Sequence, residues 1–431
     1  MPFSPLSGSV YTPGDKSISH RALIFGALAE GTSQISGLLE GDDILHTAEA
    51  MRNFGARVTR LEAGKWQVDG CGASGWQSPG SPVDFGNAGT GARLVMGAAA
   101  GFDIRADYQG DASLSARPMG RVLDPLSEMG ARFVSTNGRL PVRQIQGGSL
   151  KPISYKPPHA SAQVKSAILL AGLHTEGQTE IYEQKLTRDH TENMLEAFGC
   201  AVGRERVGAG QRVWIDGPVA LRATEVVVPG DPSSAAFLIA AALVVPGSEI
   251  IVENVMMNPT RTGLFEVLQN MGAQLALKNQ RRSGGERIAD IRVCHTPLHG
   301  IDVPADRVPS MVDEYPILAV IAATASGTTT LNGLAELRVK ESDRLQGTYE
   351  LLTVNGVRCN IDGDNLIIEG GTVQGGACVA THHDHRLAMS ALILGLAAQN
   401  PVMIDDRTMI ATSFPDYFTL MADIGAHMEQ L

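Results

Sequence analysis

The sequence predicts an α/β fold in which each of two domains contains three similar repeats. Six helix-like segments each end at a glycine that precedes a strand-like run, and successive glycines stand 69 to 84 residues apart (Gly55, Gly130, Gly199, Gly272, Gly356 and Gly425). Glycine supplies the left-handed conformation that commonly ends a helix. A second helix, apolar on every side and therefore expected to be buried, precedes most of these segments, as in 92–100, 164–173, 317–325 and 387–398. Each repeat thus pairs a buried helix with an amphipathic one.

A repeated turn divides the chain into halves. The tripeptide Pro-Gly-Asp opens an apolar run at positions 13–15 and opens another at 229–231. A solenoid would stack six equivalent repeats evenly, whereas this echo indicates a duplication. We therefore expect one domain over 15–228 and the other over 229–431 together with 1–14. The length of 431 residues agrees with two or more domains.

The first copy of the turn carries charges that the second lacks. Lys16, Ser17 and Arg21 follow the first Pro-Gly-Asp, whereas Pro232 and Phe237 occupy the lysine and arginine positions of the second. A helix N-terminus has unpaired N–H groups and a partial positive charge, so it attracts anions, and cationic side chains add to that attraction. Because the two copies share the scaffold but not the cations, we interpret Lys16 as a functional residue rather than one that serves packing. A capped helix with solvated cations is the alternative.

The overall charge limits the partners. A net charge of −11 argues against general binding to nucleic acid or to a membrane surface. Cations at expected helix starts and loops then suggest a local site for small anions (Lys16, Arg21, Arg93, Arg117, Lys165, Arg188, Lys340, Arg344 and Arg386). The five cysteines are scattered and form no CxxC pair, which predicts a reduced, cytoplasmic location and no zinc site.

Three further stretches could bind an anion. The glycine-rich turn over 84–93 lacks the Gly-Lys-Ser/Thr ending of a nucleotide P-loop, so ATP is not expected, and such a turn alone is weak support for a site. Arg117 precedes Pro118, which we expect to begin a helix, and a surface arginine is the alternative. Ser161 suits a helix cap, but capping does not explain why Gln163 and Lys165 open so apolar a run.

The second half carries the acidic candidates. Asp313 opens a buried helix, where a carboxylate usually complements the helix dipole but could act as a base if cations lie nearby. The run 338–344 holds five charges, and a solvated helix face is its alternative. The run 382–386 contains three histidines, but adjacent residues cannot all face one metal ion. We expect Arg386 to bind an anion there, with Asp384 and His385 orienting it.

Taken together, these stretches resemble the EPSP synthase family, the 3-phosphoshikimate 1-carboxyvinyltransferases, and in particular its second class. The matching segments occur in the family's order: PGDKSISHRA, DFGNAGTGAR, SARPMGR, SAQVKSAILLAG, TRDHTE, PGDPSSAA, SMVDEYP, LRVKESDR, DHRLAMS and TSFPDYF. The resemblance implies two domains of three βαβαββ units in an inside-out α/β barrel, with ligands in the interdomain cleft. It also implies transfer of the enolpyruvyl group of phosphoenolpyruvate to the 5-hydroxyl of shikimate 3-phosphate through a tetrahedral intermediate. The enzyme would be a monomer of the shikimate pathway, without metal or cofactor.

The resemblance also assigns the residues. It places shikimate 3-phosphate against Lys16, Ser17, Arg21, Ser161, Ala162, Gln163, Arg188, Asp313 and Lys340. It places phosphoenolpyruvate against Lys16, Gly89, Arg117, Gln163, Glu341, Arg344 and Arg386. Asp313 would be the base and Glu341 the acid, with Lys16 as the third catalytic residue.

The same resemblance raises the question of the inhibitor glyphosate. Some tolerant members have alanine where this chain has Gly89, so we expect glyphosate to bind here and this chain to be more sensitive than those members. The chain departs from many members at Thr412, where they have a lysine that contacts phosphoenolpyruvate.

Two other functions remain to be weighed. UDP-N-acetylglucosamine enolpyruvyl transferases share the fold but use a loop cysteine, and no cysteine here lies in a matching loop. A non-catalytic anion-binding or RNA-end-binding protein could share the scaffold, although the net charge and the pair Asp313 and Glu341 argue against it.

Overall fold

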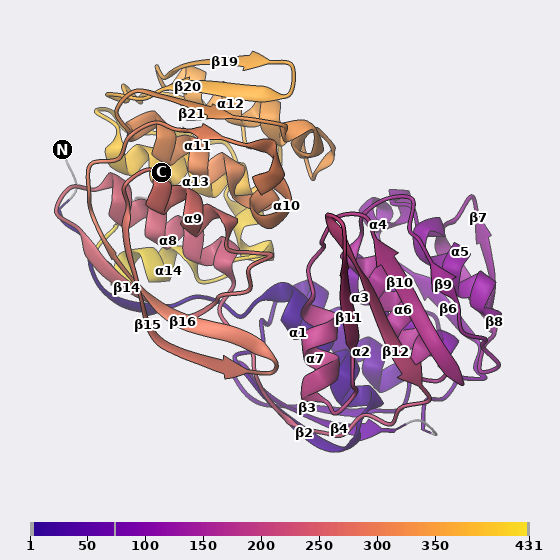
Figure 1. Cartoon of the computed structure of the whole chain (residues 1–431). Helices are drawn as coiled ribbons and strands as arrows, with labels where there is room; N and C mark the ends of the chain where they lie inside the picture. Colours follow the sequence, from indigo (N-terminus) through magenta and orange to yellow (C-terminus); the bar gives the residue numbers. More distant parts are fainter. Residues whose placement is uncertain (1–3, 73–74, 429–431) are drawn as a thin grey trace. The chain divides into compact units, whose positions relative to one another are not determined.

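The computed structural model describes residues 4–72 and 75–428. Its backbone contacts divide the chain into two compact units. We call Gly14–Val228 with Arg282–Glu286 the N-terminal unit, and Met1–Pro13, Pro229–Arg281 and Arg287–Leu431 the C-terminal unit (Figure 1). The expected domain limits differ from these unit limits at residue 14 and at 282–286. The division into two domains with the expected limits stays a prediction.

The N-terminal unit contains three four-stranded sheets that share one topology. In each, the first two strands are parallel and the other two are antiparallel to their neighbours. Their strand orders are β5 (Val83–Asp84), β6 (Ala106–Gln109), β8 (Arg139–Gln146), β7 (Arg132–Thr136); β9 (Ser154–Tyr155), β10 (Gly177–Glu183), β12 (Gly210–Gly217), β11 (Gly203–Val207); and β13 (Glu225–Val227), β2 (Glu30–Ser36), β4 (Lys65–Cys71), β3 (Arg57–Glu62).

Three buried helices form the centre of this unit. They are α1 (Lys16–Leu28), α3 (Gly89–Ala100) and α6 (Ala162–Gly172), and almost all of their residues are buried. The half-buried helices are α2 (Asp42–Asn53), α5 (Gly120–Met129) and α7 (His190–Ala197), with the short α4 (Ala112–Ala116). Small and apolar side chains let the central helices pack on all sides, which leaves their polar first turns as the places where function can reside.

The C-terminal unit repeats this plan with one reduced sheet. Its strand orders are β1 (Ser7–Tyr11), β14 (Glu249–Met256), β16 (Glu286–Cys294), β15 (Gln274–Ser283); β17 (Asp302–Val303), β18 (Thr328–Leu331), β20 (Asn365–Glu369), β19 (Arg358–Asp362); and the pair β21 (Cys378–Val379), β22 (Met403–Ile404). Its buried helices are α8 (Pro232–Val244), α11 (Tyr315–Thr324) and α13 (His385–Ala397). The others are α9 (Gly263–Asn270), α10 (Val308–Met311), α12 (Arg344–Val354) and α14 (Tyr417–Asp423), with the 3₁₀ turns η1 (Ala305–Arg307), η2 (Val312–Glu314), η3 (Leu334–Val339) and η4 (Thr408–Thr412).

These elements confirm the predicted repeats. From β5 to β8 the chain order is strand, buried helix, strand, outer helices, strand, strand, which is the βαβαββ unit. All six predicted glycines end or follow a helix with φ between 80° and 117°, a conformation in which a side chain would be strained. The sequence of each repeat therefore determines its own buried helix and its own half-buried helix.

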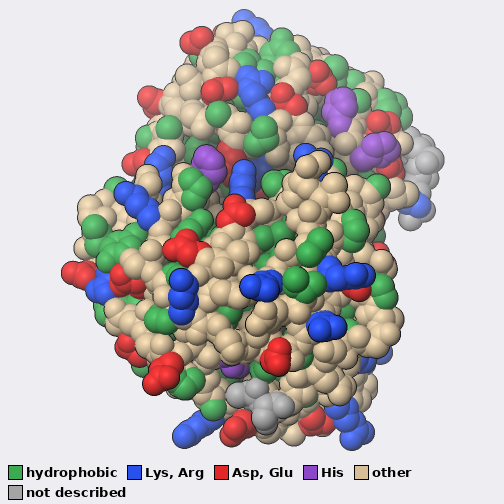
Figure 2. Space-filling view, turned by 90° about the vertical axis from the view of Figure 1, so that its right-hand side faces the viewer, with side chains coloured by type: hydrophobic (Ala, Val, Ile, Leu, Met, Phe, Trp, Pro, Cys, Tyr) green, Lys and Arg blue, Asp and Glu red, His purple; other side chains and the backbone are tan. Residues whose placement is uncertain are grey.

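The charges on one face of the molecule agree with a small-anion site rather than a polyanion surface. Basic and acidic side chains are interspersed over the face shown in Figure 2. Within 4–72 and 75–428, no helix has the length and apolar character that crossing a membrane requires.

Candidate active site

The first helix start is capped as the sequence predicts. Asp15 Oδ1 accepts the N–H of Ile18 at 2.8 Å, and α1 then begins at Lys16. The Lys16 ammonium group lies 2.5 Å from Asp43 Oδ2, and the lysine side chain is 42% exposed. An ion pair this open to solvent is weak, so the ammonium group can exchange its partner for a bound anion. The sequence reading did not identify Asp43.

Arg21 lies deeper in the same helix and is held by neutral oxygens. Its Nε donates to Thr191 Oγ1 at 2.8 Å, its Nη2 to Ser166 Oγ at 3.0 Å, and its Nη1 to the Ser17 carbonyl at 2.9 Å. Burial lowers the pKa of Arg21 to about 10, so it still carries its charge near neutral pH. A guanidinium has five N–H donors, and these three bonds leave two for a ligand.

The glycine-rich turn gathers two more guanidinium groups beside Gly89. Arg93 Nη1 donates to Gln163 Oε1 at 2.8 Å, and Arg117 Nη2 donates to Asn87 Oδ1 at 2.8 Å. A Cβ atom on Gly89 would lie 3.1 Å from Arg93 Nη1 and 3.4 Å from Arg117 Nη1. Burial, and next the neighbouring Arg117, lowers the pKa of Arg93 to about 10. The structure thus brings together three of the residues expected at phosphoenolpyruvate, and adds Arg93.

The remaining candidates of this unit lie at helix starts. Ser161 caps α6 by accepting the N–H of Val164 at 3.4 Å, and Ala162 is the first residue of that helix. Arg188 is half-buried in the loop before α7. Pro118 does not begin a helix, contrary to our expectation, because α5 begins at Gly120.

Lys165 does not belong with the ligand-facing cations. Its side chain is fully buried and contacts Glu183 at 2.9 Å and Glu192 at 2.6 Å. Its inclusion among the anion-binding candidates was wrong, because its charge is already compensated inside the unit.

In the C-terminal unit, both acidic candidates contact one buried arginine. Arg344, the first residue of α12, lies 3.2 Å from Asp313 Oδ1 through Nη1 and 2.6 Å from Glu341 Oε2 through Nη2. Lys340 Nζ is 4.0 Å from the same Asp313 oxygen. The Asp313 side chain is largely buried, whereas that of Glu341 is 50% exposed. Four of the expected residues are thus brought together.

Asp384 contacts both Arg344 and Arg386. Its Oδ1 accepts the N–H of Arg386 at the start of α13 at 2.9 Å, and its Oδ2 accepts from Arg344 Nε at 2.8 Å. Burial opposes the charge of Asp384, but Arg344 holds the pKa of this carboxyl below its ordinary value. Arg386 Nη1 donates to the Asp313 carbonyl at 3.2 Å. Asp384 therefore holds the guanidinium group of Arg344, which the sequence did not predict, and caps α13 through the backbone N–H of Arg386.

Two alternatives raised by the sequence are wrong. Residues 340–343 connect η3 to α12 rather than lying on a helix face, and Arg344 is buried rather than solvated. The histidines beside Asp384 do not gather on one ion, since His382 contacts Glu350 at 3.2 Å and His383 contacts Asp406 at 3.3 Å.

Comparison with known proteins identifies the family. The family model described as EPSP synthase (3-phosphoshikimate 1-carboxyvinyltransferase) matches residues 1–421. The chain belongs to the EPSP synthase family. It is 56% identical to the 3-phosphoshikimate 1-carboxyvinyltransferase of Acidiphilium cryptum (strain JF-5), over 99% of this chain and 96% of the relative. The relative from Maricaulis maris (strain MCS10) is 54% identical over 100% of this chain and 96% of its own.

Solved EPSP synthases share the fold. A 2.37 Å structure of EPSP synthase from Acinetobacter baumannii superposes with a TM-score of 0.93 at 43% identity, over 99% of this chain and 98% of that one. The predicted family and fold are confirmed. The reaction of this enzyme is enolpyruvyl transfer from phosphoenolpyruvate to shikimate 3-phosphate, a step of the shikimate pathway.

Among residues 4–72 and 75–428 of this EPSP synthase family member, one group of side chains has the spacing of metal ligands. Potential ligand atoms of Asp189, His190 and Glu286 lie within 4.8 Å of one another. However, His190 Nδ1 lies 2.8 Å from Glu286 Oε1, and the Asn193 amide donates to Asp189 Oδ1 at 3.2 Å and to Glu286 Oε1 at 3.4 Å. Hydrogen bonding accounts for the arrangement, so we assign no metal to it.

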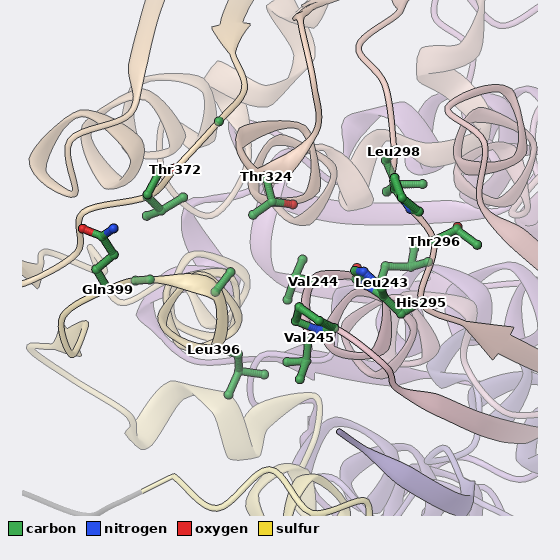
Figure 3. A pocket seen from close by; sticks show the side chains of 16 residues that line it. Leu243, Val244, Val245, His295, Thr296, Leu298, Thr324, Thr372, Leu396 and Gln399 are labelled. Atoms are coloured by element: carbon green, nitrogen blue, oxygen red, sulfur yellow. The ribbon is translucent and has the colours of Figure 1, made fainter. Parts of the chain in front are cut away.

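A cavity of about 560 Å³ in the C-terminal unit lies away from the candidate residues. The C-terminal ends of α8, α11 and α13 line it through Val244, Thr324 and Leu396, and His295 and Gln399 contribute polar atoms (Figure 3). Arg386 stands at the opposite end of α13, roughly 15–18 Å away at 1.5 Å per residue. This cavity is therefore not the anion site.

Proposed function

We propose that this enzyme joins its substrates with two carboxyl groups of the C-terminal unit, Asp313 as base and Glu341 as acid. The observation that carries the proposal is their common contact with the buried Arg344, at 3.2 Å and 2.6 Å. A guanidinium group binds phosphate and carboxylate groups through paired hydrogen bonds. With phosphoenolpyruvate on Arg344, both carboxyl groups would stand beside the reacting carbons.

The chemistry proceeds in two stages. Asp313 takes the proton of the 5-hydroxyl of shikimate 3-phosphate while that oxygen bonds to C2 of phosphoenolpyruvate, and the electron pair of the double bond takes a proton from Glu341 at C3. The tetrahedral adduct then loses a C3 proton back to Glu341, the double bond re-forms, and the bond from C2 to the phosphate oxygen breaks with its electrons leaving on phosphate, which takes up the proton that Asp313 had removed. Cations that hold the departing phosphate stabilise its developing charge.

The carboxyl groups around Arg344 outnumber the cations that they face. Among the described residues, the cations Lys340, Arg344 and Arg386 face five carboxyl groups, those of Asp313, Glu314, Glu336, Glu341 and Asp384. An anionic substrate adds negative charge, which favours uptake of a proton by a neighbouring carboxylate. Glu341 is half exposed and can leave Arg344 when the substrate arrives.

The other assignments follow the contacts within each unit. We assign shikimate 3-phosphate to Lys16, Ser17, Arg21, Ser161, Ala162, Gln163, Arg188, Asp313 and Lys340. We assign phosphoenolpyruvate to Lys16, Gly89, Arg117, Gln163, Glu341, Arg344 and Arg386, with Lys16 assisting proton transfer. The exchangeable ammonium group of Lys16, the free donors of Arg21 and the paired guanidinium groups beside Gly89 support this division.

Three further properties belong to the proposal. Glyphosate would inhibit by occupying the phosphoenolpyruvate side of the site next to Gly89. The enzyme would act as a monomer, since its exposed large apolar side chains, such as Tyr11, Val134 and Val339, come from separate elements. A cytoplasmic location agrees with five free cysteines.

The roles of the two carboxyl groups are tested by isosteric replacement. Asp313→Asn and Glu341→Gln should each lower kcat by about 10²–10⁴-fold, the usual contribution of a general acid or base. Glu336→Gln is the matched control, because this 59% exposed carboxylate also contacts Lys340, at 3.0 Å, and should leave kcat unchanged. Phosphate release would be measured with phosphoenolpyruvate and shikimate 3-phosphate. Near-normal kcat in either of the first two variants, with a folded protein, would refute that residue's role.

The acceptor is tested in the same assay. Phosphate release should require shikimate 3-phosphate and should not occur when a UDP-sugar replaces it. Release with the UDP-sugar would instead support the related enolpyruvyl transferase, and no release with either acceptor would support a non-catalytic protein.

A further inference from the structure

Lys165 is a fully buried lysine to which the proposed mechanism gives no role. Its Nζ lies 2.9 Å from Glu183 Oε2 and 2.6 Å from Glu192 Oε1, and the three side chains are at most 3% exposed. Burial alone would lower the pKa of Lys165, but the two carboxylates hold it above its ordinary value. The lysine is therefore charged inside the N-terminal unit, and it ties together β10, α6 and α7.

The two carboxylates are not equally satisfied. Glu183 also accepts hydrogen bonds from the Thr187 hydroxyl and from Gln211 Nε2, the latter at 2.8 Å. The second oxygen of Glu192 has no hydrogen-bond partner among the described residues. Burial raises the pKa of Glu192, and Lys165 opposes this only in part, because one lysine faces two carboxyl groups. A negative charge on Glu192 is therefore unfavourable unless another cation lies nearby.

The neighbouring cation is Arg21. Ser166 directly follows Lys165, and Thr191 directly precedes Glu192. The Ser166 and Thr191 hydroxyl groups are 2.6 Å apart, and each accepts one hydrogen bond from the Arg21 guanidinium. The Lys165–Glu192 ion pair thus joins α6 to α7. On each helix, the residue of the ion pair is next in sequence to the residue whose hydroxyl group holds Arg21. Moreover, the negative charge of Glu192 counteracts the effect of burial on the pKa of Arg21.

We propose that Lys165, Glu183 and Glu192 form a positioning cluster that holds Arg21 for the phosphate group of shikimate 3-phosphate. The ion pairs fix the spacing between the starts of α6 and α7, and this spacing fixes the two hydroxyl acceptors. The inference rests on the assignment of Arg21 to shikimate 3-phosphate in the proposed function.

The test removes the Lys165–Glu192 ion pair between α6 and α7 while keeping the side-chain lengths and the net charge of the cluster, since Glu183 is retained. In the double variant Lys165→Met/Glu192→Gln, Glu183 keeps its bonds to Thr187 and Gln211. We expect KM for shikimate 3-phosphate to rise about tenfold or more, the effect of weakening one charge-assisted hydrogen bond. KM for phosphoenolpyruvate and kcat should stay within about twofold, since Arg21 is not assigned to that substrate.

A control pair separates this effect from loss of any ion pair. Glu62 and Lys65 form an ion pair in the same unit, but both side chains are more than half exposed. The variant Lys65→Met/Glu62→Gln should therefore leave both KM values unchanged. Equal changes in the two KM values of the double variant, or a fall in kcat alone, would mean that the cluster only supports the fold and would overturn the proposal.

Two further measurements keep the test decisive. If the double variant does not fold, as judged by circular dichroism, Glu192→Gln alone retains a neutral Lys165–Glu183 pair and should still raise KM for shikimate 3-phosphate selectively. An unchanged KM in that variant would also overturn the proposal. The unmodified enzyme is assayed alongside: absence of turnover there would refute the proposed function, whereas normal turnover with unchanged variant KM values would refute the positioning cluster alone.

Discussion

Gly89→Ala adds one carbon atom at the point where two guanidinium groups meet. The new Cβ would lie 3.1 Å from Arg93 Nη1, 3.2 Å from Leu114 Cδ1 and 3.4 Å from Arg117 Nη1. Gly89 is the first residue of α3 and does not have a positive φ, so alanine fits the backbone. The consequence of the substitution is therefore crowding of the two arginine side chains rather than backbone strain.

The size of the effect follows from these distances. Non-bonded heavy atoms pack best at about 3.5–4.0 Å, so Arg93 Nη1 must retreat by roughly 0.4 Å or more. Its bond to Gln163, now 2.8 Å, can lengthen that far without breaking. If the bound substrate loses about a third of one charge-assisted bond, affinity falls by roughly 0.5–1 kcal/mol, which is about a two- to fivefold rise in KM for phosphoenolpyruvate.

Glyphosate should be affected more strongly than phosphoenolpyruvate. Its chain of atoms between the phosphorus and the carboxylate is longer, so in our proposal it fills the space next to Gly89. Forcing an extra carbon into a packed site costs about 1–3 kcal/mol, which predicts a rise of roughly 5- to 150-fold in the inhibition constant. The ratio of this constant to KM for phosphoenolpyruvate should therefore increase.

The assay is steady-state phosphate release at several glyphosate concentrations. Gly120→Ala is the matched control, because Gly120 also begins a helix of the N-terminal unit, and its Cβ would meet only Asp124 Oδ2, at 3.9 Å. Both kinetic constants should be unchanged in the control. If Gly89→Ala raised the glyphosate constant no more than KM for phosphoenolpyruvate, glyphosate would not occupy the space beside Gly89 and the reasoning would fail.

Two other outcomes can be measured without a substrate. Burial lowers the pKa of His174 to about 4, against about 6.5 in an unfolded chain, so its contribution to stability is complete above pH 6.5 and is lost as pH falls toward 4. The loss by pH 5 is about 2 kcal/mol, and urea unfolding of His174→Gln should show a smaller decrease between pH 7 and pH 5 than the unmodified enzyme; an equal decrease would contradict this. Sedimentation should give the mass of a single chain, and a dimer mass at micromolar concentration would refute the monomer.

The repeats were predictable because their signals are local. A left-handed helix end needs glycine at one position, and Gly55 and Gly356 satisfy that need at φ of 106° and 80° whatever surrounds them. The same holds for the helix caps, since Asp15 and Asp231 each accept an N–H group within three residues. Strand order and helix burial then follow from repeating one unit.

The partners of the charged residues were not predictable in this way. Arg344 and Asp384 are 40 residues apart in sequence, and Lys165 in α6 meets Glu192 in α7 only in the folded chain. A cation in the first turn of an apolar helix looks the same in the sequence whether it faces a ligand or a buried carboxylate. Glu192 precedes the buried Met194 and Leu195 in the sequence. A carboxylate so close to buried residues could have indicated that a cation such as Lys165 faces a buried carboxylate rather than a ligand.

The two copies of the Pro-Gly-Asp turn show how one scaffold can either keep or lose an anion site. At α8, the buried Arg261 donates to the capping Asp231 at 2.8 Å and to Ser233 at 3.0 Å, so a cation of the same unit already occupies the region of the helix start. Phe237 takes the position equivalent to Arg21 and packs in the core against an aromatic ring 6.5 Å away. At α1 the cation beside the cap is the half-exposed Lys16, whose pair with a carboxylate is open to exchange. The helix caps that the two copies share therefore explain the fold. The positions at which the copies differ, Lys16 against Pro232 and Arg21 against Phe237, distinguish a helix start that can bind a substrate from a purely structural one.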